Sequence, residues 1–186
     1  SDKRVIILQG AGINVDRGSE ELLEALAHSD DYVLYIVGTG DVIEDLKQRA
    51  SEEDLQNKVV FVGRVPYSEM MQYTLNADVG VTLDKDTNIN YRFSLPNKIF
   101  DYMKAGIPIV ASDLKEVANI IHTYKVGVVI KNHNPQTILN GLNAVLNSEE
   151  AIKTYSKNGL KGVEQLNWES EVQPVREIYT TFIDSE

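Results

Sequence analysis

Short apolar runs alternate along the chain with amphipathic segments. Six runs rich in β-branched residues are the expected strands, at residues 5–8, 32–37, 59–62, 79–83, 107–111 and 126–130. Runs that are apolar on both faces are typical of parallel strands covered by helices on both sides of a sheet. The pattern therefore predicts a buried parallel sheet of six strands.

The segments between these runs have the spacing of amphipathic helices. Leu22, Leu23 and Leu26 fall on one stripe of the first segment, and the segment after the second strand repeats this pattern. The expected crossover helices lie at residues 20–28, 42–50, 68–75, 96–104, 114–124 and 135–146. Since parallel strands need long right-handed crossovers, we expect an α/β fold with an open, doubly wound, Rossmann-like sheet and helices on both faces.

After residue 130 the pattern is helical only. Extra C-terminal helices are expected at residues 149–166 and 168–183. Helices without a following strand must pack on the flank of the sheet or on something absent from this chain, and Trp168 is the expected anchor. No internal repeat or linker interrupts the pattern, so residues 1–186 are expected to form a single domain.

Composition removes several kinds of chemistry. The 186 residues include no cysteine, which excludes disulfides, thiolate metal sites and cysteine nucleophiles. The three histidines do not form a His-x-x-x-His pair, and no metal site is expected. The formal net charge of −10 argues against a nucleic-acid partner, although small anions could bind locally.

The sequence predicts neither a membrane span nor a signal peptide. No apolar stretch approaches the roughly 18 to 20 residues that span a bilayer, and the start does not have the pattern of a signal peptide. A cytoplasmic location is therefore expected. The first residue is Ser1 and a strand is expected almost at once, which suggests a piece of a longer protein.

The loop after the first strand has the features of an anion site. It carries Gly10, Gly12 and Arg17 immediately before an expected helix. Free amides and the helix dipole at such a terminus favour a phosphate group. A dinucleotide fingerprint would need a glycine at Val15, and no P-loop sequence occurs. Gly38 and Gly40, after the second strand, are either a tight turn or a second ligand loop.

The connection after the fourth strand is unusually long and polar. Pro96 is suited to a first helical turn, where nearby amides are free. Asp101 lies about one turn further on, where its carboxylate could accept hydrogen bonds from a ribose diol. The alternative is a helix-surface acid paired with Lys98 or Lys104. The letters Asp84-Lys85-Asp86 fit a metal motif, but we interpret them as a solvated loop.

Residues 97–112 (NKIFDYMKAGIPIVAS) closely resemble the stretch of group 1 (family 4) glycosyltransferases that carries the nucleotide-sugar carboxylate. The glycine and basic residues at 9–18, the strand ends at 37–40 and 61–66, and the segments 76–79 and 167–169 are also similar and fall in the same order. The resemblance thus covers nearly the whole chain. It implies the C-terminal, donor-binding half of a two-domain GT-B enzyme whose N-terminal acceptor domain is absent from this chain.

The resemblance also assigns roles to residues. It implies a base site near Gly63, Arg64 and Val65, a ribose contact at Asp101 and a diphosphate contact at Arg17. Two departures are visible: Ala11 stands where the family often has an arginine, and Phe93 stands where the first of two acids separated by seven residues is common. Lys98 and Arg92 are candidates to replace the lost charge. Glu116 matches a frequent acid that faces the sugar, its alternative being a helix N-terminal acid.

The expected activity is transfer of a glycosyl group from a nucleoside diphosphate sugar to a sugar or lipid-linked acceptor, in polysaccharide or glycoconjugate synthesis. The resemblance implies a metal-free, usually retaining reaction without a cofactor, and it is compatible with peripheral membrane association of the full-length protein. The alternatives are a non-catalytic binding or scaffold domain of the same fold and a sugar-nucleotide epimerase. The expected catalytic residues are Arg17, Asp101 and Lys98. The expected substrate-binding residues are Gly10, Gly12, Gly38, Gly40, Gly63, Arg64, Val65, Phe93, Ser94, Leu95, Pro96, Asn97 and Glu116.

Overall fold

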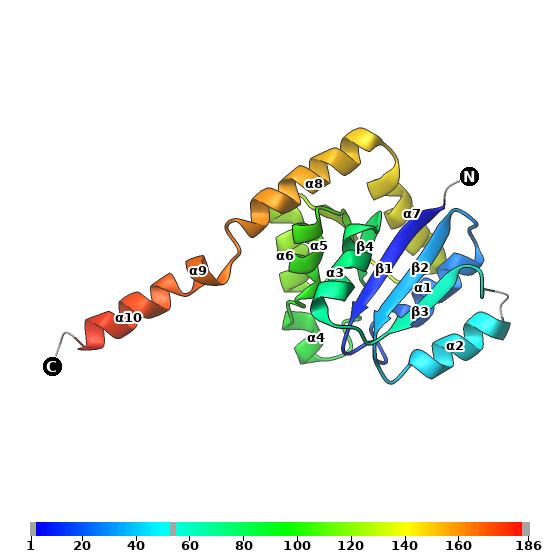
Figure 1. Cartoon of the computed structure of the whole chain (residues 1–186), viewed down its shortest axis with the longest axis horizontal. Coiled ribbons are helices and arrows are strands. Elements are labelled where there is room, and N and C mark those ends of the chain that lie inside the picture. Colours follow the sequence, from blue (N-terminus) through cyan, green and yellow to red (C-terminus); the bar gives the residue numbers. More distant parts are fainter. Residues whose placement is uncertain (1–2, 53–54, 184–186) are drawn as a thin grey trace.

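The computed structural model describes residues 3–52 and 55–183 and shows one six-stranded parallel sheet (Figure 1). The strands are β1 (Arg4–Gly10), β2 (Tyr32–Gly38), β3 (Val59–Gly63), β4 (Val79–Thr82), β5 (Ile109–Ser112) and β6 (Gly127–Ile130). Their order is β3-β2-β1-β4-β5-β6, and every pair is parallel. This confirms the doubly wound sheet. Its strand order reverses between β1 and β4, the place where open α/β sheets bind ligands.

Helices cover both faces of the sheet. Those on one face are α1 (Ser19–Ala27), α2 (Ile43–Glu52) and α7 (Pro135–Leu146), and those on the other are α3 (Tyr67–Leu75), α5 (Lys98–Ala105) and α6 (Lys115–Tyr124). Alternate strand residues enter the two cores, as Ile6 and Leu8 enter one while Ile7 enters the other. The predicted burial of both sheet faces is therefore correct.

Helix α8 (Glu149–Val163) covers the outer side of the second helix layer, the one formed by α3, α5 and α6. It packs on α5 and α6. Its glycines permit this close approach, because a Cβ added at Gly159 would lie 3.0 Å from the carbonyl oxygen of Met103. α8 thus occupies the flank of the domain beside α5.

The chain leaves the body of the domain after α8. One helix was expected at residues 168–183, but two are present, α9 (Trp168–Glu171) and α10 (Gln173–Ile183). Pro174 has no N–H to continue the hydrogen bonds of α9. α10 extends away from the sheet (Figure 1). Trp168, the expected anchor, is 72% exposed and does not pack on the flank of the sheet, where α8 lies. Its packing on something absent from this chain stays a prediction.

The long polar connection contains a short helix that the pattern did not predict. α4 (Ile89–Phe93) begins at Asn88, whose side-chain oxygen accepts a hydrogen bond of 3.0 Å from the Tyr91 N–H. α4 contacts α6 and so folds the connection back over the second layer. Among the described residues, no helix has both the length and the apolar composition needed to cross a bilayer.

Candidate functional site

A cleft of about 250 Å³ opens where β1 ends, beside the start of α5. A second hollow of about 180 Å³ lies towards the end of β3 and shares part of the wall of the first. The first cleft is lined by Gln9, Gly10, Ala11, Gly12, Arg17, Met70, Pro96, Asn97, Lys98 and Asp101. The second is lined by Gly10, Ala11, Val37, Gly38, Thr39, Arg64, Val65, Tyr67 and Met70. The structure therefore brings together most of the residues predicted from the sequence.

The loop after β1 offers free backbone donors to the first cleft. In the described part of the chain, the N–H groups of Ala11 and Gly12 form no hydrogen bond. The next N–H, that of Ile13, donates to the carbonyl oxygen of Thr39 at 3.0 Å, and this bond ties the loop to the end of β2. Two free N–H groups in a loop that leads into a helix are suited to binding an anion.

The two glycines after β2 permit this close packing. A Cβ at Gly38 would meet the carbonyl oxygen of Gly10, and a Cβ at Gly40 would meet that of Ile13. Gly38 also lines the second hollow, whereas Gly40 lines neither. For Gly40 the tight-turn alternative is therefore the one that the geometry favours.

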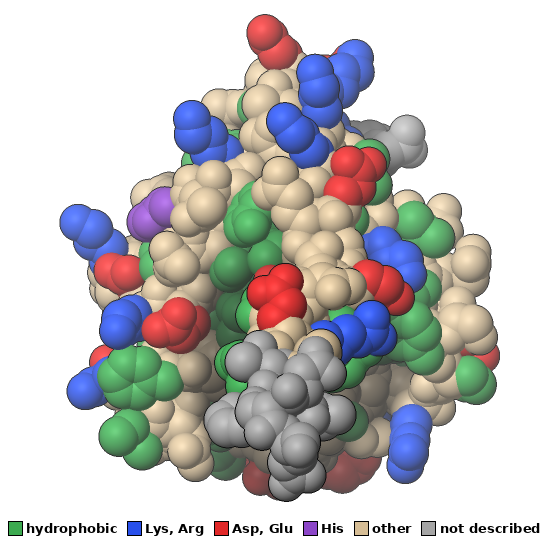
Figure 2. Space-filling model, turned by 90° about the vertical axis from the view of Figure 1, so that its left-hand side faces the viewer, with side chains coloured by type: hydrophobic (Ala, Val, Ile, Leu, Met, Phe, Trp, Pro, Cys, Tyr) green, Lys and Arg blue, Asp and Glu red, His purple; other side chains and the backbone are tan. Residues whose placement is uncertain are grey.

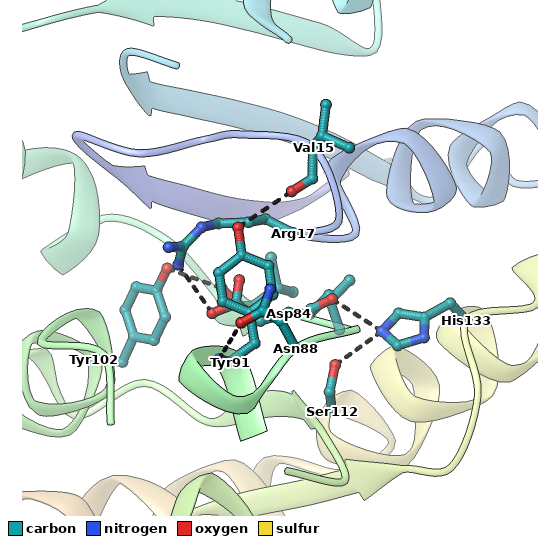
Figure 3. A network of polar contacts seen from close by, with 10 residues as sticks. Val15, Arg17, Asp84, Asn88, Tyr91, Tyr102, Ser112 and His133 are labelled. Carbon is teal, nitrogen blue, oxygen red and sulfur yellow. Dashed lines mark hydrogen bonds and ion pairs between the residues drawn. The ribbon is translucent and has the colours of Figure 1, made fainter. Parts of the chain in front are cut away.

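Arg17 is held by a buried carboxylate and an aromatic ring (Figure 3). Its Nη1 lies 3.1 Å from Oδ2 of Asp84, and its guanidinium carbon lies 4.7 Å from the centre of the Tyr91 ring. The Asp84 side chain is only 1% exposed, and its Oδ1 has no hydrogen-bond partner among the described residues. The interpretation of Asp84 as part of a solvated loop is therefore wrong. The reason is its position directly after a buried strand, where the first-loop cation reaches it.

A histidine fixes the backbone that carries Asp84. Nε2 of His133 lies 2.9 Å from both Oγ of Ser112 and the carbonyl oxygen of Leu83, and so joins the ends of β4, β5 and β6 (Figure 3). Gly18 also packs closely against Leu83, because an added Cβ there would meet the same carbonyl oxygen. The backbone directly before Asp84 is thus held by contacts with two other loops.

Lys98 supplies the second positive charge of the cleft. Its ammonium forms no hydrogen bond or ion pair with the described residues, unlike Arg92, which binds Asp86 at 2.9 Å. Burial lowers the pKa of Lys98, with Arg17 acting in the same direction and Asp84 opposing it. The N–H groups of Asn97 and Lys98 also form no hydrogen bond in the described part of the chain. The start of α5 therefore adds one free cation and two free amides.

The Asp101 carboxylate stands at the junction of the two hollows. Its Oδ2 accepts a hydrogen bond of 3.0 Å from Nε2 of Gln9, and its Oδ1 accepts one of 2.8 Å from the Tyr67 hydroxyl. The bond to Asp101 raises the pKa of the Tyr67 phenol. Neither Lys98 nor Lys104 forms an ion pair with Asp101 among the described contacts. The geometry therefore does not support the helix-surface alternative.

Some predicted residues lie outside both hollows. Phe93 is 49% exposed and its ring lies 5.3 Å from the Lys115 ammonium. Glu116 is half-buried at the start of α6, also beside Lys115. Gly40, Gly63, Ser94 and Leu95 also line neither hollow. The N–H of Ser94 donates to the carbonyl oxygen of Tyr91 at 3.3 Å.

The structure adds residues that the sequence analysis missed. Asp84, Tyr91 and Tyr67 contact predicted residues across long separations in sequence, and Gln9 contacts Asp101 from 92 positions away. One available signal was position, since Gln9 and Asp84 stand at the ends of the two strands that flank the switch point. No periodic pattern in the sequence identifies these contact partners.

The fold and cleft place the chain among α/β proteins with a doubly wound sheet, which bind ligands at the switch point. The model of the family described as "Glycosyl transferases group 1" matches residues 1–162, so the chain belongs to this family. An uncharacterized glycosyltransferase of Methanocaldococcus jannaschii is 22% identical over 175 residues, which cover 90% of this chain and 43% of that protein. The phosphatidyl-myo-inositol mannosyltransferase of Mycobacterium leprae is 27% identical over 173 residues, 91% of this chain and 44% of that protein. The chain thus spans somewhat less than half the length of these relatives.

Solved structures show the same fold. Sucrose-phosphate synthase from Thermosynechococcus elongatus has a TM-score of 0.85 at 20% identity, over 100% of this chain and 47% of that one. HepE of Anabaena, in complex with UDP and glucose, has a TM-score of 0.77 at 17% identity, over 96% and 48%. The Rossmann-like fold expected from the sequence is therefore the fold of known glycosyltransferases.

Proposed function

We propose that this chain binds a nucleoside diphosphate sugar in the two joined hollows and supplies the donor site of a glycosyltransferase. The enzyme would transfer the glycosyl group to an acceptor hydroxyl, in polysaccharide or glycoconjugate synthesis. Family membership supports this proposal, and so do solved relatives of the same fold that hold UDP or UDP-glucose. Because the chain spans less than half of its curated relatives, the acceptor site belongs in the proposal to a further domain.

The observation that carries the proposal is the order of groups along the two hollows. The hollow by Arg64 and Val65 can take a base, Asp101 at the junction can take a ribose diol, and the cleft beyond it holds Arg17, Lys98 and free amides. A nucleoside diphosphate presents its base, ribose and phosphates in that order. The match concerns three chemically different groups, which a simple anion site would not require.

The proposed chemistry is stabilisation of the leaving diphosphate. The bond between the anomeric carbon and the diphosphate oxygen breaks, a bond from that carbon to the acceptor oxygen forms, and the acceptor hydroxyl gives its proton to the leaving diphosphate or to water. Negative charge develops on the diphosphate, where Arg17, Lys98 and the amides of the first loop and α5 are already in place. Fixed donors in a partly enclosed cleft are effective because they need no reorganisation when the charge appears. A reaction without a metal remains part of the proposal.

Isothermal titration calorimetry with UDP, ADP, GDP and CDP tests the proposal. We expect one of them to bind in the micromolar range, and Lys98→Met and Asp101→Ala to weaken it at least about ten-fold, since each removes a contact to a charged or polar group. Lys104→Met is the matched control, because Lys104 is exposed on the same helix and lines neither hollow. Absence of binding to all four would refute the donor site and favour a scaffold domain.

A further inference from the structure

We propose that Tyr67 competes with the ligand for Asp101 and so limits how strongly this cleft favours a ribonucleotide: its hydroxyl binds the Asp101 oxygen that a ribose hydroxyl would take. A ligand hydroxyl then takes this place on Oδ1 by replacing the phenol. This inference rests on the proposed function and names a residue that neither the family resemblance nor the sequence pattern assigned.

The position of Tyr67 is the first support. It is the first residue of α3, its side chain is 56% exposed, and its ring lines the hollow proposed for the base. Its hydroxyl nevertheless reaches Oδ1 of Asp101, at 2.8 Å, on the border of the neighbouring cleft. An exposed phenol at a helix start can leave this bond without disturbing a packed core. Tyr67 is therefore free to exchange with a ligand.

The second support is that the other Asp101 oxygen is not free to exchange. Oδ2 accepts from the side-chain amide of Gln9, which is only 1% exposed. The buried hydroxyl of Thr74 donates to the amide oxygen of Gln9 at 2.6 Å, which turns the amide nitrogen towards Asp101. These two hydrogen bonds hold Oδ2 on a buried partner, so Oδ1 is the oxygen whose partner can be exchanged.

The two hydrogen bonds of Asp101 predict an exchange that changes the affinity for a ribonucleotide in one direction. In the free protein Oδ1 binds the Tyr67 hydroxyl, and in the complex it would bind a ribose hydroxyl while the phenol returns to water. The protein bond is lost in this exchange, so Tyr67 lowers the affinity for a ribonucleotide. A nucleotide without ribose hydroxyls cannot displace the phenol and pays no such cost, but it also gains no contact with Asp101.

The experiment compares Tyr67→Phe with the wild-type chain. The probe is UDP, or whichever of ADP, GDP and CDP binds most tightly, together with its 2′,3′-dideoxy form, and the readout is the dissociation constant by calorimetry. We expect Tyr67→Phe to bind the ribonucleotide about three-fold to ten-fold more tightly, the range for one hydrogen bond of ordinary net strength. The affinity for the dideoxy form should change less than about two-fold, within the usual effect of a surface substitution.

Two further variants separate this role from a structural one. Tyr73→Phe is the matched control, because Tyr73 lies on the same helix with its ring packed 6.1 Å from that of Tyr35, outside both hollows. It should change neither affinity. In an Asp101→Ala background, Tyr67→Phe should have no effect on the ribonucleotide, since the bond it removes no longer exists.

The outcomes are distinguishable. If a ribonucleotide binds but Tyr67→Phe leaves its affinity unchanged, or weakens both forms equally, Tyr67 is a packing residue and this inference is wrong while the donor site stands. If none of the four nucleoside diphosphates binds the wild-type chain, the proposed function and this inference are both overturned. A gain confined to the ribonucleotide, and dependent on Asp101, supports the exchange.

Discussion

The two cations of the cleft differ in what surrounds them. Arg17 has a carboxylate partner in Asp84 and an aromatic partner in Tyr91, so its charge is compensated before any ligand arrives. Lys98 has neither, and burial lowers its pKa. The charge that a bound anion would change most is therefore that of Lys98.

This difference predicts a pH dependence of nucleotide binding. The free protein releases the Lys98 proton at a lower pH than an ordinary lysine, whereas a bound diphosphate would favour the charged form. As pH rises through the lowered pKa, binding must take up a proton, and affinity should fall, at most about ten-fold per pH unit. Calorimetry in HEPES and in Tris, which have different ionisation enthalpies, measures that uptake directly.

Lys98→Arg is the control for the pH prediction, because a guanidinium keeps its charge throughout the range. Proton uptake on binding should disappear in this variant, and the loss of affinity with rising pH should disappear with it. The diphosphate itself, with a last pKa of about 6, is fully ionised across the range. Equal proton uptake by the variant and the wild-type chain would show that another group titrates.

For single residues, the sequence predicted which residue types lie at the site and where. It did not predict which side chains contact one another there. Arg17 was identified by its place between the first strand and a helix, Asp101 by its place one turn into a helix together with the family resemblance, and Lys98 as a candidate to replace a charge that the family has and this chain lacks. Their partners Asp84 and Tyr67 depend on how separate loops meet, which is a property of tertiary packing. For Asp84, the polar residues that follow it in the sequence even favoured an exposed side chain.

Among the elements, the crossover loops are shaped by glycines with a positive φ. Gly18 precedes α1 with φ 73°, and Gly63 ends β3 with φ 79°. They differ in surroundings: a Cβ at Gly18 would meet the backbone of Leu83, while a Cβ at Gly63 would have nothing within 4 Å. A comparison of substitutions at the two glycines therefore separates the cost of backbone strain from the cost of a steric clash.

Alanine at each position gives a matched prediction. Gly63→Ala should lower the free energy of unfolding by about 1 to 2 kcal/mol, the cost of a left-handed backbone for an L-residue. Gly18→Ala should cost about 3 kcal/mol or more, because the β4–α4 backbone must also move. Urea unfolding followed by far-ultraviolet circular dichroism measures both values. Equal losses would mean that the Leu83 backbone yields freely and is not held by His133.

The elements that were predicted well are those with a strong apolar period. All six strands and the crossover helices appear within a few residues of their expected places, because each must bury an apolar face. α4 was missed because five residues capped by Asn88 have no room for a period. The break before α10 was missed because the amphipathic stripe continues across Pro174, although a single absent N–H suffices to interrupt the helix.

For the whole molecule, the main contrast is between a layered body and an extension. The body is closed by α8, and the family match ends within it, at residue 162. Beyond it, α10 packs mainly on α9, and Trp168, Val175, Ile178 and Tyr179 are all about half exposed or more. These side chains contribute little apolar burial to the body, so they should contribute little to its stability.

Removal of residues 168–186 tests this division. The shortened chain should keep its free energy of unfolding within about 0.5 kcal/mol, the usual range for changes that touch no core, and it should bind nucleotide as the full chain does. In the full chain, Trp168, the one tryptophan of the sequence, is 72% exposed and should be quenched by acrylamide almost as readily as free indole. Removal of residues 149–186 is the contrasting variant, because it uncovers the α5 surface against which Gly159 and Gly162 pack. A marked loss of stability in the first variant, or a shielded tryptophan, would show that α9 and α10 fold back onto the body.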